Sequence, residues 1–198
     1  MAKNALLKAL RNLIERLPDA PQDSSYLFDE LAQANDHSCV LLAAEALSEA
    51  LKRAMLRRFR DNLSRDDRDD LFDFRGPLGT FSSRIQIGYA MSIFGPKTLG
   101  DLERVRELRN VFAHSKMGLS FQTKEVADVC ELFETHSRDP FGARFFNPSV
   151  KTLQPDRWPR YRFEISATML WSALNSITSR PPELGPEWEK SRPSLVLG

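Results

Sequence analysis

The 198-residue sequence has little glycine, little cysteine and almost no net charge. Nine glycines and few alternating apolar-polar stretches favour an all-helical chain over a β-sheet protein. Two cysteines, each inside an apolar run, do not make the disulfide framework of a small secreted protein and suit a reducing compartment. A formal net charge of +1 provides no overall attraction to nucleic acid or to an anionic membrane.

Several motifs of catalytic and cofactor chemistry are absent as well. The sequence contains no phosphate-binding loop, no G-x-G-x-x-G dinucleotide motif and no G-x-S-x-G nucleophile elbow. Its three histidines are scattered, and His37 and Cys39 fall on different faces of a helix, so no metal site is expected. The first 18 residues are too charged and too short for a signal peptide or a membrane span. We therefore expect a cytoplasmic protein without metal, cofactor or membrane contact.

Most of the chain follows the 3.6-residue period of amphipathic helices. Hydrophobic residues make up 41% of the sequence and charged residues 28%, which allows a substantial core beneath a solvated surface. The helices predicted from this pattern cover residues 4–17, 24–34, 37–60, 81–94, 98–114, 124–135 and 163–178. The predicted fold class is therefore all-α, a helical bundle.

The composition changes after Asp139, where eight of the twelve prolines lie. Residues 137–160 are expected to form an extended, partly aromatic loop, with or without a short pair of strands. The proline-rich segment at 180–198 has no periodicity and is expected to be a mobile tail. The predicted organisation is a helical domain at 1–179 followed by an irregular, proline-rich C-terminal segment.

The most specific pattern combines four segments. They are D-x-S-C-V-L-L-A-A at Asp36–Ala44, P-L-G-T-F-S-x-R-I at Pro77–Ile85, Gly-Tyr-Ala at Gly88–Ala90 and R-N-x-F-A-H at Arg109–His114. Over roughly residues 25–135 the chain resembles the mannitol operon repressor family. The resemblance implies an all-helical fold and a role in the transcriptional regulation of carbohydrate use.

The segment Arg109–His114 also resembles the R-x4-6-H motif of the HEPN superfamily. Members of that superfamily are helical-bundle domains, often dimeric, and several are metal-independent ribonucleases. The resemblance implies that Arg109 and His114 act on a scissile phosphate and that Asn110 takes the place of the polar residue that commonly follows the arginine. Arg109 would stabilise the developing negative charge, and His114 would transfer a proton.

The helical wheel supports a structural interpretation of Arg109 instead. Four apolar residues form the buried stripe of the helix at 98–114: Leu102, Val105, Leu108 and Phe112. Arg109 falls inside this stripe, and Glu45 lies inside the apolar run of another helix. Because a buried carboxylate needs a partner, we predict an ion pair between Glu45 and Arg109. His114 would then stabilise the negative end of its helix, and we favour this interpretation over catalysis.

The predicted helix at 81–94 carries two further structural predictions. Arg84 is expected to be a half-buried cation paired with an acid such as Glu49. Gly88 inside the helix predicts close packing against another helix. The same helix offers more apolar surface than one neighbour needs, which favours a homodimer; the residues concerned are Ile85, Tyr89 and Ile93.

Direct DNA binding has little support in the sequence. The closest helix pair, 81–94 and 98–114, carries as many acids as arginines on its second helix, which is a poor surface for phosphates. The best candidate for nucleic-acid contact is a basic-aromatic run with the residues Arg157, Trp158, Arg160 and Arg162. The interpretation that we favour is an edge loop whose aromatic rings pack while its arginines stay solvated.

These observations predict a regulatory, repressor-like protein of carbohydrate metabolism that acts mainly through protein contacts rather than as an enzyme. The alternative is a ribonuclease that uses Arg109 and His114, with RNA as its partner. A third hypothesis, from a different class, is a structural interaction module whose proline-rich tail docks on other proteins.

Overall fold

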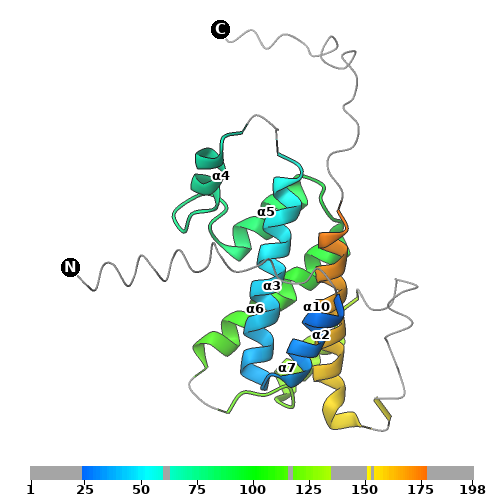
Figure 1. The fold of residues 1–198 in the computed structure, drawn as a ribbon. Coiled ribbons are helices and arrows are strands. Elements are labelled where there is room, and N and C mark those ends of the chain that lie inside the picture. Colours follow the sequence, from blue (N-terminus) through cyan, green and yellow to red (C-terminus); the bar gives the residue numbers. More distant parts are fainter. Residues whose placement is uncertain (1–23, 60–62, 116–117, 135–150, 153, 178–198) are drawn as a thin grey trace, which may run out of the picture.

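The structure is a computed structural model that describes residues 24–59, 63–115, 118–134, 151–152 and 154–177. Every regular element within these residues is a helix, which confirms the all-α prediction (Figure 1). The elements are α2 (Ser24–Gln33), α3 (Asp36–Leu56), α4 (Arg65–Phe72), α5 (Phe81–Ala90), α6 (Pro96–His114), α7 (Lys124–Glu131), the 3-10 turn η2 (Pro155–Arg157) and α10 (Trp158–Asn175). The predicted helix at 4–17, the tail at 180–198 and most of the predicted loop at 137–160 lie outside the described residues.

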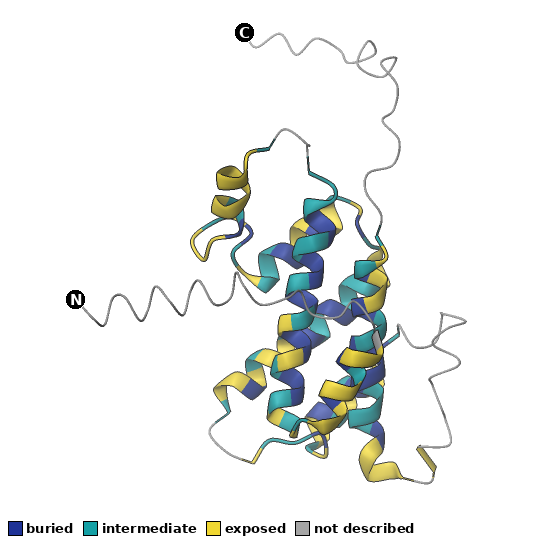
Figure 2. Ribbon diagram, viewed as in Figure 1, coloured by how far each residue is buried: buried dark blue, intermediate teal, exposed yellow. Residues whose placement is uncertain are grey.

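Helix α3 is the central element of the bundle. It packs against α2, α5, α6 and α10, and Figure 1 shows it between α6 and α10. Ten of its residues are buried, namely Cys39, Val40, Ala43, Ala44, Leu47, Ser48, Ala50, Leu51, Ala54 and Met55. Burial on several sides agrees with the nearly all-apolar first half of the helix (Figure 2). No described helix is long and apolar enough to cross a membrane.

Three helix starts show how local sequence signals act. Thr80 begins α5, where its hydroxyl accepts a hydrogen bond from the Ser83 backbone N–H. Helix α6 begins at Pro96, two residues before the prediction, because proline suits the first turn of a helix. Asn35 caps α3, with its side-chain oxygen accepting a hydrogen bond from the Ser38 backbone N–H at 2.9 Å.

Helix α4 is a highly charged segment that lies at the edge of the bundle (Figures 1 and 2). Its one buried residue is Phe72, whose ring stacks on Phe59 at a centroid distance of 6.0 Å. Cations from α3 and α5, Lys52 and Arg84, lie 5.2 Å and 5.4 Å from the same ring. A single aromatic side chain therefore anchors this helix to the bundle.

Gly88 confirms the predicted close packing of α5. A Cβ atom at this position would lie 3.2 Å from Leu51 Cδ1 of α3 and 2.9 Å from Phe94 Cε1. Gly100 in α6 is the natural comparison, because its added Cβ would meet only the flexible side chain of Arg104, at 3.2 Å. The first glycine serves helix packing, whereas the second merely weakens its helix.

We therefore expect the same substitution to have opposite effects at the two positions. Gly88→Ala should lower the free energy of unfolding by about 1 kcal/mol, because overpacking a core costs more than the gain in helix propensity. Gly100→Ala should raise it by about 0.5–1 kcal/mol, the propensity difference alone. Urea denaturation monitored by circular dichroism measures both; equal effects would contradict this account of Gly88.

Candidate functional site

The segment Arg109–His114, which carries the two alternative interpretations of the sequence, forms the last turns of α6. Phe112 is fully buried and packs against the rings of His37 and Phe121, with centroid distances of 6.2 Å and 5.9 Å. The residues around it face outward: Arg109, Val111, Ala113 and His114 are exposed, and Asn110 is half-buried. We call the group of Asn110, Val111, His114 and the nearby His37 the α6 face; Arg109 points to the other side of the helix.

The predicted ion pair between Glu45 and Arg109 is wrong. Both side chains are exposed, and no ion pair joins them. Arg109 Nη1 instead donates a hydrogen bond to Asn110 Oδ1 at 3.3 Å.

The predicted buried stripe of α6 is nevertheless correct. All four of its residues, Leu102, Val105, Leu108 and Phe112, are buried, and Asp101 is buried beside them. On the wheel Arg109 falls between Val105 and Leu102, yet it lies in the last turns of α6, where its side chain is exposed. A helical wheel gives the direction of a side chain but not whether a neighbouring helix covers that turn.

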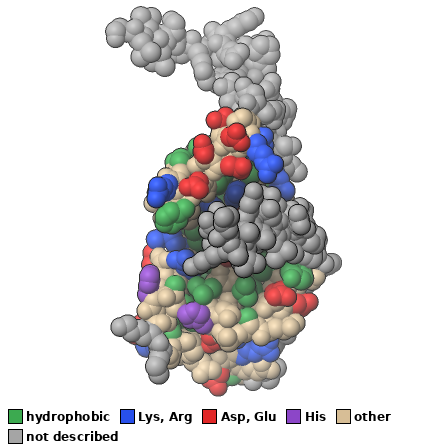
Figure 3. Space-filling model, turned by 60° about the vertical axis from the view of Figure 1, so that its left-hand side comes forward, with side chains coloured by type: hydrophobic (Ala, Val, Ile, Leu, Met, Phe, Trp, Pro, Cys, Tyr) green, Lys and Arg blue, Asp and Glu red, His purple; other side chains and the backbone are tan. Residues whose placement is uncertain are grey.

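The α6 face has the character of a contact surface. Both histidines of the described chain, His37 and His114, appear on the side of the molecule shown in Figure 3. Val111 is 50% exposed between polar neighbours. General acid-base chemistry on a phosphate needs groups converging on one shielded point, whereas Arg109 and His114 are open to solvent. This geometry therefore adds no support to the ribonuclease hypothesis.

Arg84 is paired as predicted. Its Nη1 atom lies 3.0 Å from Glu49 Oε1 and also donates to the Ser48 hydroxyl at 2.9 Å. Its Nε atom donates to the Leu78 carbonyl at 2.8 Å. This side chain, only 7% exposed, thus ties the turn before α5 to α3. Arg84, the arginine of the P-L-G-T-F-S-x-R-I segment, is therefore a structural residue.

Arg160 lies at a second and larger polar junction. It donates to Glu164 Oε1 at 2.7 Å and to Asp36 Oδ1 at 2.8 Å. Its Nη2 atom donates to the carbonyl groups at the end of α2, those of Leu31, Ala32 and Ala34. The last carbonyl groups of a helix have no partners within the helix, so this guanidinium caps α2 while it pairs two acids.

Arg162 caps the end of α7 in the way that Arg160 caps the end of α2. It donates to the carbonyl groups of Cys130, Glu131 and Phe133, at 2.8, 2.6 and 2.8 Å. Its Nη1 atom lies 3.2 Å from Glu131 Oε2, and the Trp158 indole N–H donates to Glu131 Oε1 at 2.7 Å. The first turn of α10 therefore closes the ends of two helices at once.

These contacts correct the predicted nucleic-acid site. Residues 158–162 belong to a helix and not to an edge loop, because Pro159 sits in the first turn of α10, where proline is favoured. Trp158 is 5% exposed, and the arginines at 160 and 162 are bound to protein acceptors. Of the four candidate residues only Arg157 is exposed, so this run presents no stacking platform to a nucleic acid.

Sequence reasoning missed the acids that complete these junctions. Glu164 is 1% exposed and Asp101 is fully buried; burial raises the pKa of the Glu164 carboxyl, against which its hydrogen bond to Arg160 acts. Asp101 accepts two hydrogen bonds from the Glu134 backbone N–H, both at 3.1 Å. The spacing of Arg160 and Glu164, four residues apart, was the available signal.

The two cysteines are buried and free, as the sequence predicted. Burial raises the pKa of both Cys39 and Cys130 to about 12, so neither thiol is a nucleophile at neutral pH. Within the described part of the chain, no group of three His, Cys, Asp or Glu residues could hold a metal ion.

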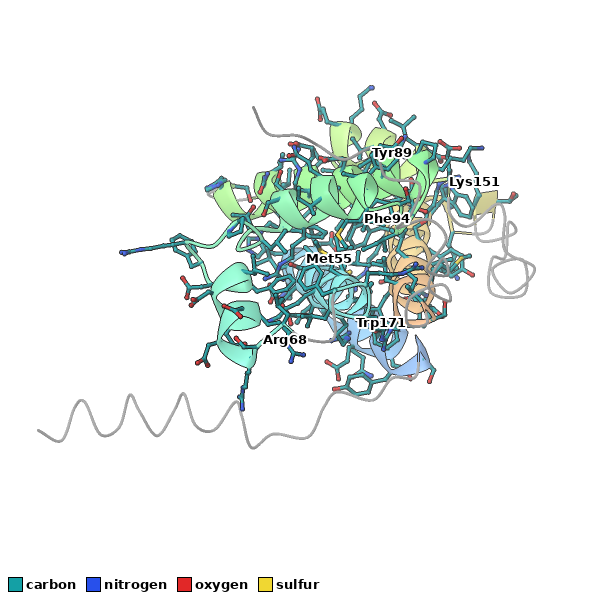
Figure 4. The ribbon with its side chains drawn as sticks, turned by 90° about the horizontal axis from the view of Figure 1, so that it is seen from above. Met55, Arg68, Tyr89, Phe94, Lys151 and Trp171 are labelled. Carbon is teal, nitrogen blue, oxygen red and sulfur yellow. The ribbon has the colours of Figure 1, made fainter. Side chains whose placement is uncertain are left out.

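The surface proposed for a homodimer is smaller than expected. Ile85 and Ile93 are 0% and 8% exposed, buried in the core of the chain itself. Tyr89 remains 42% exposed and packs against Phe94 at a centroid distance of 6.4 Å (Figure 4). Dimerisation stays a prediction, with less apolar surface to support it.

Comparison with known proteins gives one informative likeness. Neither the protein-family models nor the curated proteins contain a match to this chain. The solved structures include a match titled as the X-ray structure of the MtlR-HPr complex from Escherichia coli. It has 23% sequence identity and a TM-score of 0.59, and the alignment covers 77% of this chain and 98% of that chain. The two chains share a fold.

The junction at Arg160 predicts a large and specific loss of stability. Arg160→Ala leaves Glu164, Asp36 and the end of α2 without their donor, and should lower the free energy of unfolding by about 3 kcal/mol or more. Arg160→Lys should lower the free energy of unfolding by a smaller amount, because the lysine ammonium keeps the charge but lacks the planar guanidinium that serves several acceptors. The exposed Arg157→Ala is the matched control and should change it by less than about 0.5 kcal/mol. Similar losses at both positions, measured by urea denaturation, would contradict the assignment.

Proposed function

We propose that this chain is a regulatory protein of the mannitol repressor type, that it acts through contacts with protein partners, and that it takes part in the control of carbohydrate use in the cytoplasm. The observation that carries the proposal is the fold shared with MtlR, a protein whose structure was solved in complex with HPr. The P-L-G-T-F-S-x-R-I segment at Pro77–Ile85 supports the same family independently. The free, buried thiols fit a reducing compartment.

The way the arginines are used favours protein partners over DNA. In α6, Arg104 pairs with Asp101 at 2.6 Å and Arg106 pairs with Glu103 at 2.7 Å. Proteins that bind DNA directly neutralise phosphates with unpaired Lys and Arg side chains on one surface. The second helix of the α5–α6 pair offers mostly neutralised arginines, so a direct operator contact is not part of the proposal.

We place the partner contact on the α6 face. It combines a half-exposed apolar residue, Val111, with an amide and two histidines. Non-obligate interfaces have this mixed character, an apolar centre within a polar rim. Phe112 beneath the face is fixed in the core by two ring contacts, which holds the surface in one conformation.

The first partner to test is HPr. Isothermal titration of the full chain with HPr from the same organism should give saturable binding. Val111→Asp should weaken that binding by at least about tenfold, because it places a charge at the centre of the contact. Phe74→Ser is the matched control, since Phe74 is the most exposed large hydrophobic residue of the described part of the chain, at 85%, and lies outside the α6 face; it should leave the affinity for HPr unchanged.

Three results would contradict different parts of the proposal. Absence of HPr binding by a chain that circular dichroism shows to be folded would remove the proposed partner. Sequence-dependent DNA binding with a Kd on the order of nanomolar, seen by gel shift, would replace protein contact with direct DNA recognition. Weakening by Phe74→Ser but not by Val111→Asp would move the contact to another surface.

A further inference from the structure

A cavity of about 320 Å³ lies between α3 and α4, away from the α6 face. Its lining comes from α3 and α4 and consists of Lys52, Leu56, Arg65, Arg68, Asp69 and Phe72. In Figure 4, Arg68 extends from α4 on the side that faces the bundle. This volume is at the lower end of the range for small-molecule sites in proteins.

The residues that line the cavity carry more positive than negative charge, although α4 also carries three aspartates that do not line it, Asp66, Asp67 and Asp70. Three of its lining residues are cations and one is an acid, Asp69, which lies 3.7 Å from Arg65. Within the described residues, neither Lys52 nor Arg68 has a carboxylate at ion-pair distance. Arg68 donates through Nε to the Ser64 carbonyl at 3.3 Å, which leaves its terminal N–H groups available.

The apolar part of the lining is packed against the bundle. Phe72 is 7% exposed and stacks on Phe59, with the Lys52 ammonium 5.2 Å and the Arg84 guanidinium 5.4 Å from its ring centroid. Leu56 of α3 also lines the cavity. A ligand in this site therefore meets two apolar side chains together with the cationic ones.

We propose that this cavity binds a small phosphate monoester with an apolar body. A phosphate monoester carries a charge of about −1.5 to −2 at neutral pH. A ligand of this charge matches the two cations Lys52 and Arg68 better than a ligand with a single carboxylate would. The planar guanidinium of Arg68 suits bidentate binding of phosphate oxygens, and Lys52 adds a point charge. Leu56 and Phe72 would cover the apolar part of the ligand.

The site extends the proposed function by adding a small-molecule effector. Lys52 and His37 are 15 residues apart in α3, which corresponds to roughly 22 Å along the helix. A ligand in the cavity would therefore not touch the partner on the α6 face. Binding in the cavity can be measured without HPr, so it can fail or succeed independently of the proposed partner.

Isothermal titration of the full chain with phenyl phosphate tests the proposal. We expect saturable binding of phenyl phosphate, weaker binding of inorganic phosphate, and no binding of phenol. Arg68→Ala should weaken phenyl phosphate binding by at least about tenfold, as expected for loss of a charged hydrogen-bond donor. Arg75→Ala is the matched control, because Arg75 is exposed and does not line the cavity. This variant should bind phenyl phosphate with unchanged affinity.

Three outcomes would overturn the proposal. Absence of phenyl phosphate binding up to about 10 mM would exclude the site. Equal weakening by Arg68→Ala and Arg75→Ala would show diffuse attraction to a basic surface. Binding of inorganic phosphate as tight as that of phenyl phosphate would remove the role of Leu56 and Phe72. Circular dichroism of each variant separates loss of binding from loss of fold.

Discussion

Two arginines in the first turn of α10 hold the ends of two other helices, and the bundle depends on them. Arg160 binds the terminal carbonyl groups of α2, and Arg162 binds those of α7. Such carbonyl groups are costly to bury without donors, and a guanidinium can serve several at once. Because α10 also packs along α3, these contacts set the position of three helices around the central one.

The same physical solution recurs at other places in the chain. Arg57, at the end of α3, donates to the carbonyl groups of Asn175 and Ile177 and so closes the far end of α10. Arg84 joins the loop before α5 to α3, and the Asp101 carboxylate accepts a hydrogen bond from the Glu134 backbone N–H. Much of the charge in a chain of near-zero net charge is thus committed to helix junctions. This use of arginine explains why, of the arginines in the basic run at 157–162, only Arg157 is exposed.

Sequence patterns predicted the fold class, the packing at Gly88 and the pair formed by Arg84 and Glu49. These features follow from local periodicity, or from a charge placed inside an apolar run. Arg109 was misplaced because a helical wheel gives the direction of a side chain but not whether another helix covers that turn of α6. The run at 157–162 was misassigned because a proline was taken as a sign of a loop, whereas Pro159 occupies the first turn of a helix.

The helical bundle carries two separate surfaces that the proposals above concern. The α6 face lies beside the buried ring of Phe112, and Phe72 lines the cavity between α3 and α4. In both places a buried aromatic ring fixes the backbone while charged or polar groups face outward. A protein partner and a small anion could then act on one rigid helix, α3, from opposite ends.

Amide hydrogen exchange of two single variants tests the central claim about α10 most directly. If each arginine closes its own helix, Arg160→Ala should lose protection mainly in α2, and Arg162→Ala mainly in α7, while α5 keeps its protection in both. Unchanged protection in α2 and α7, or the same uniform loss in both variants, would contradict the account.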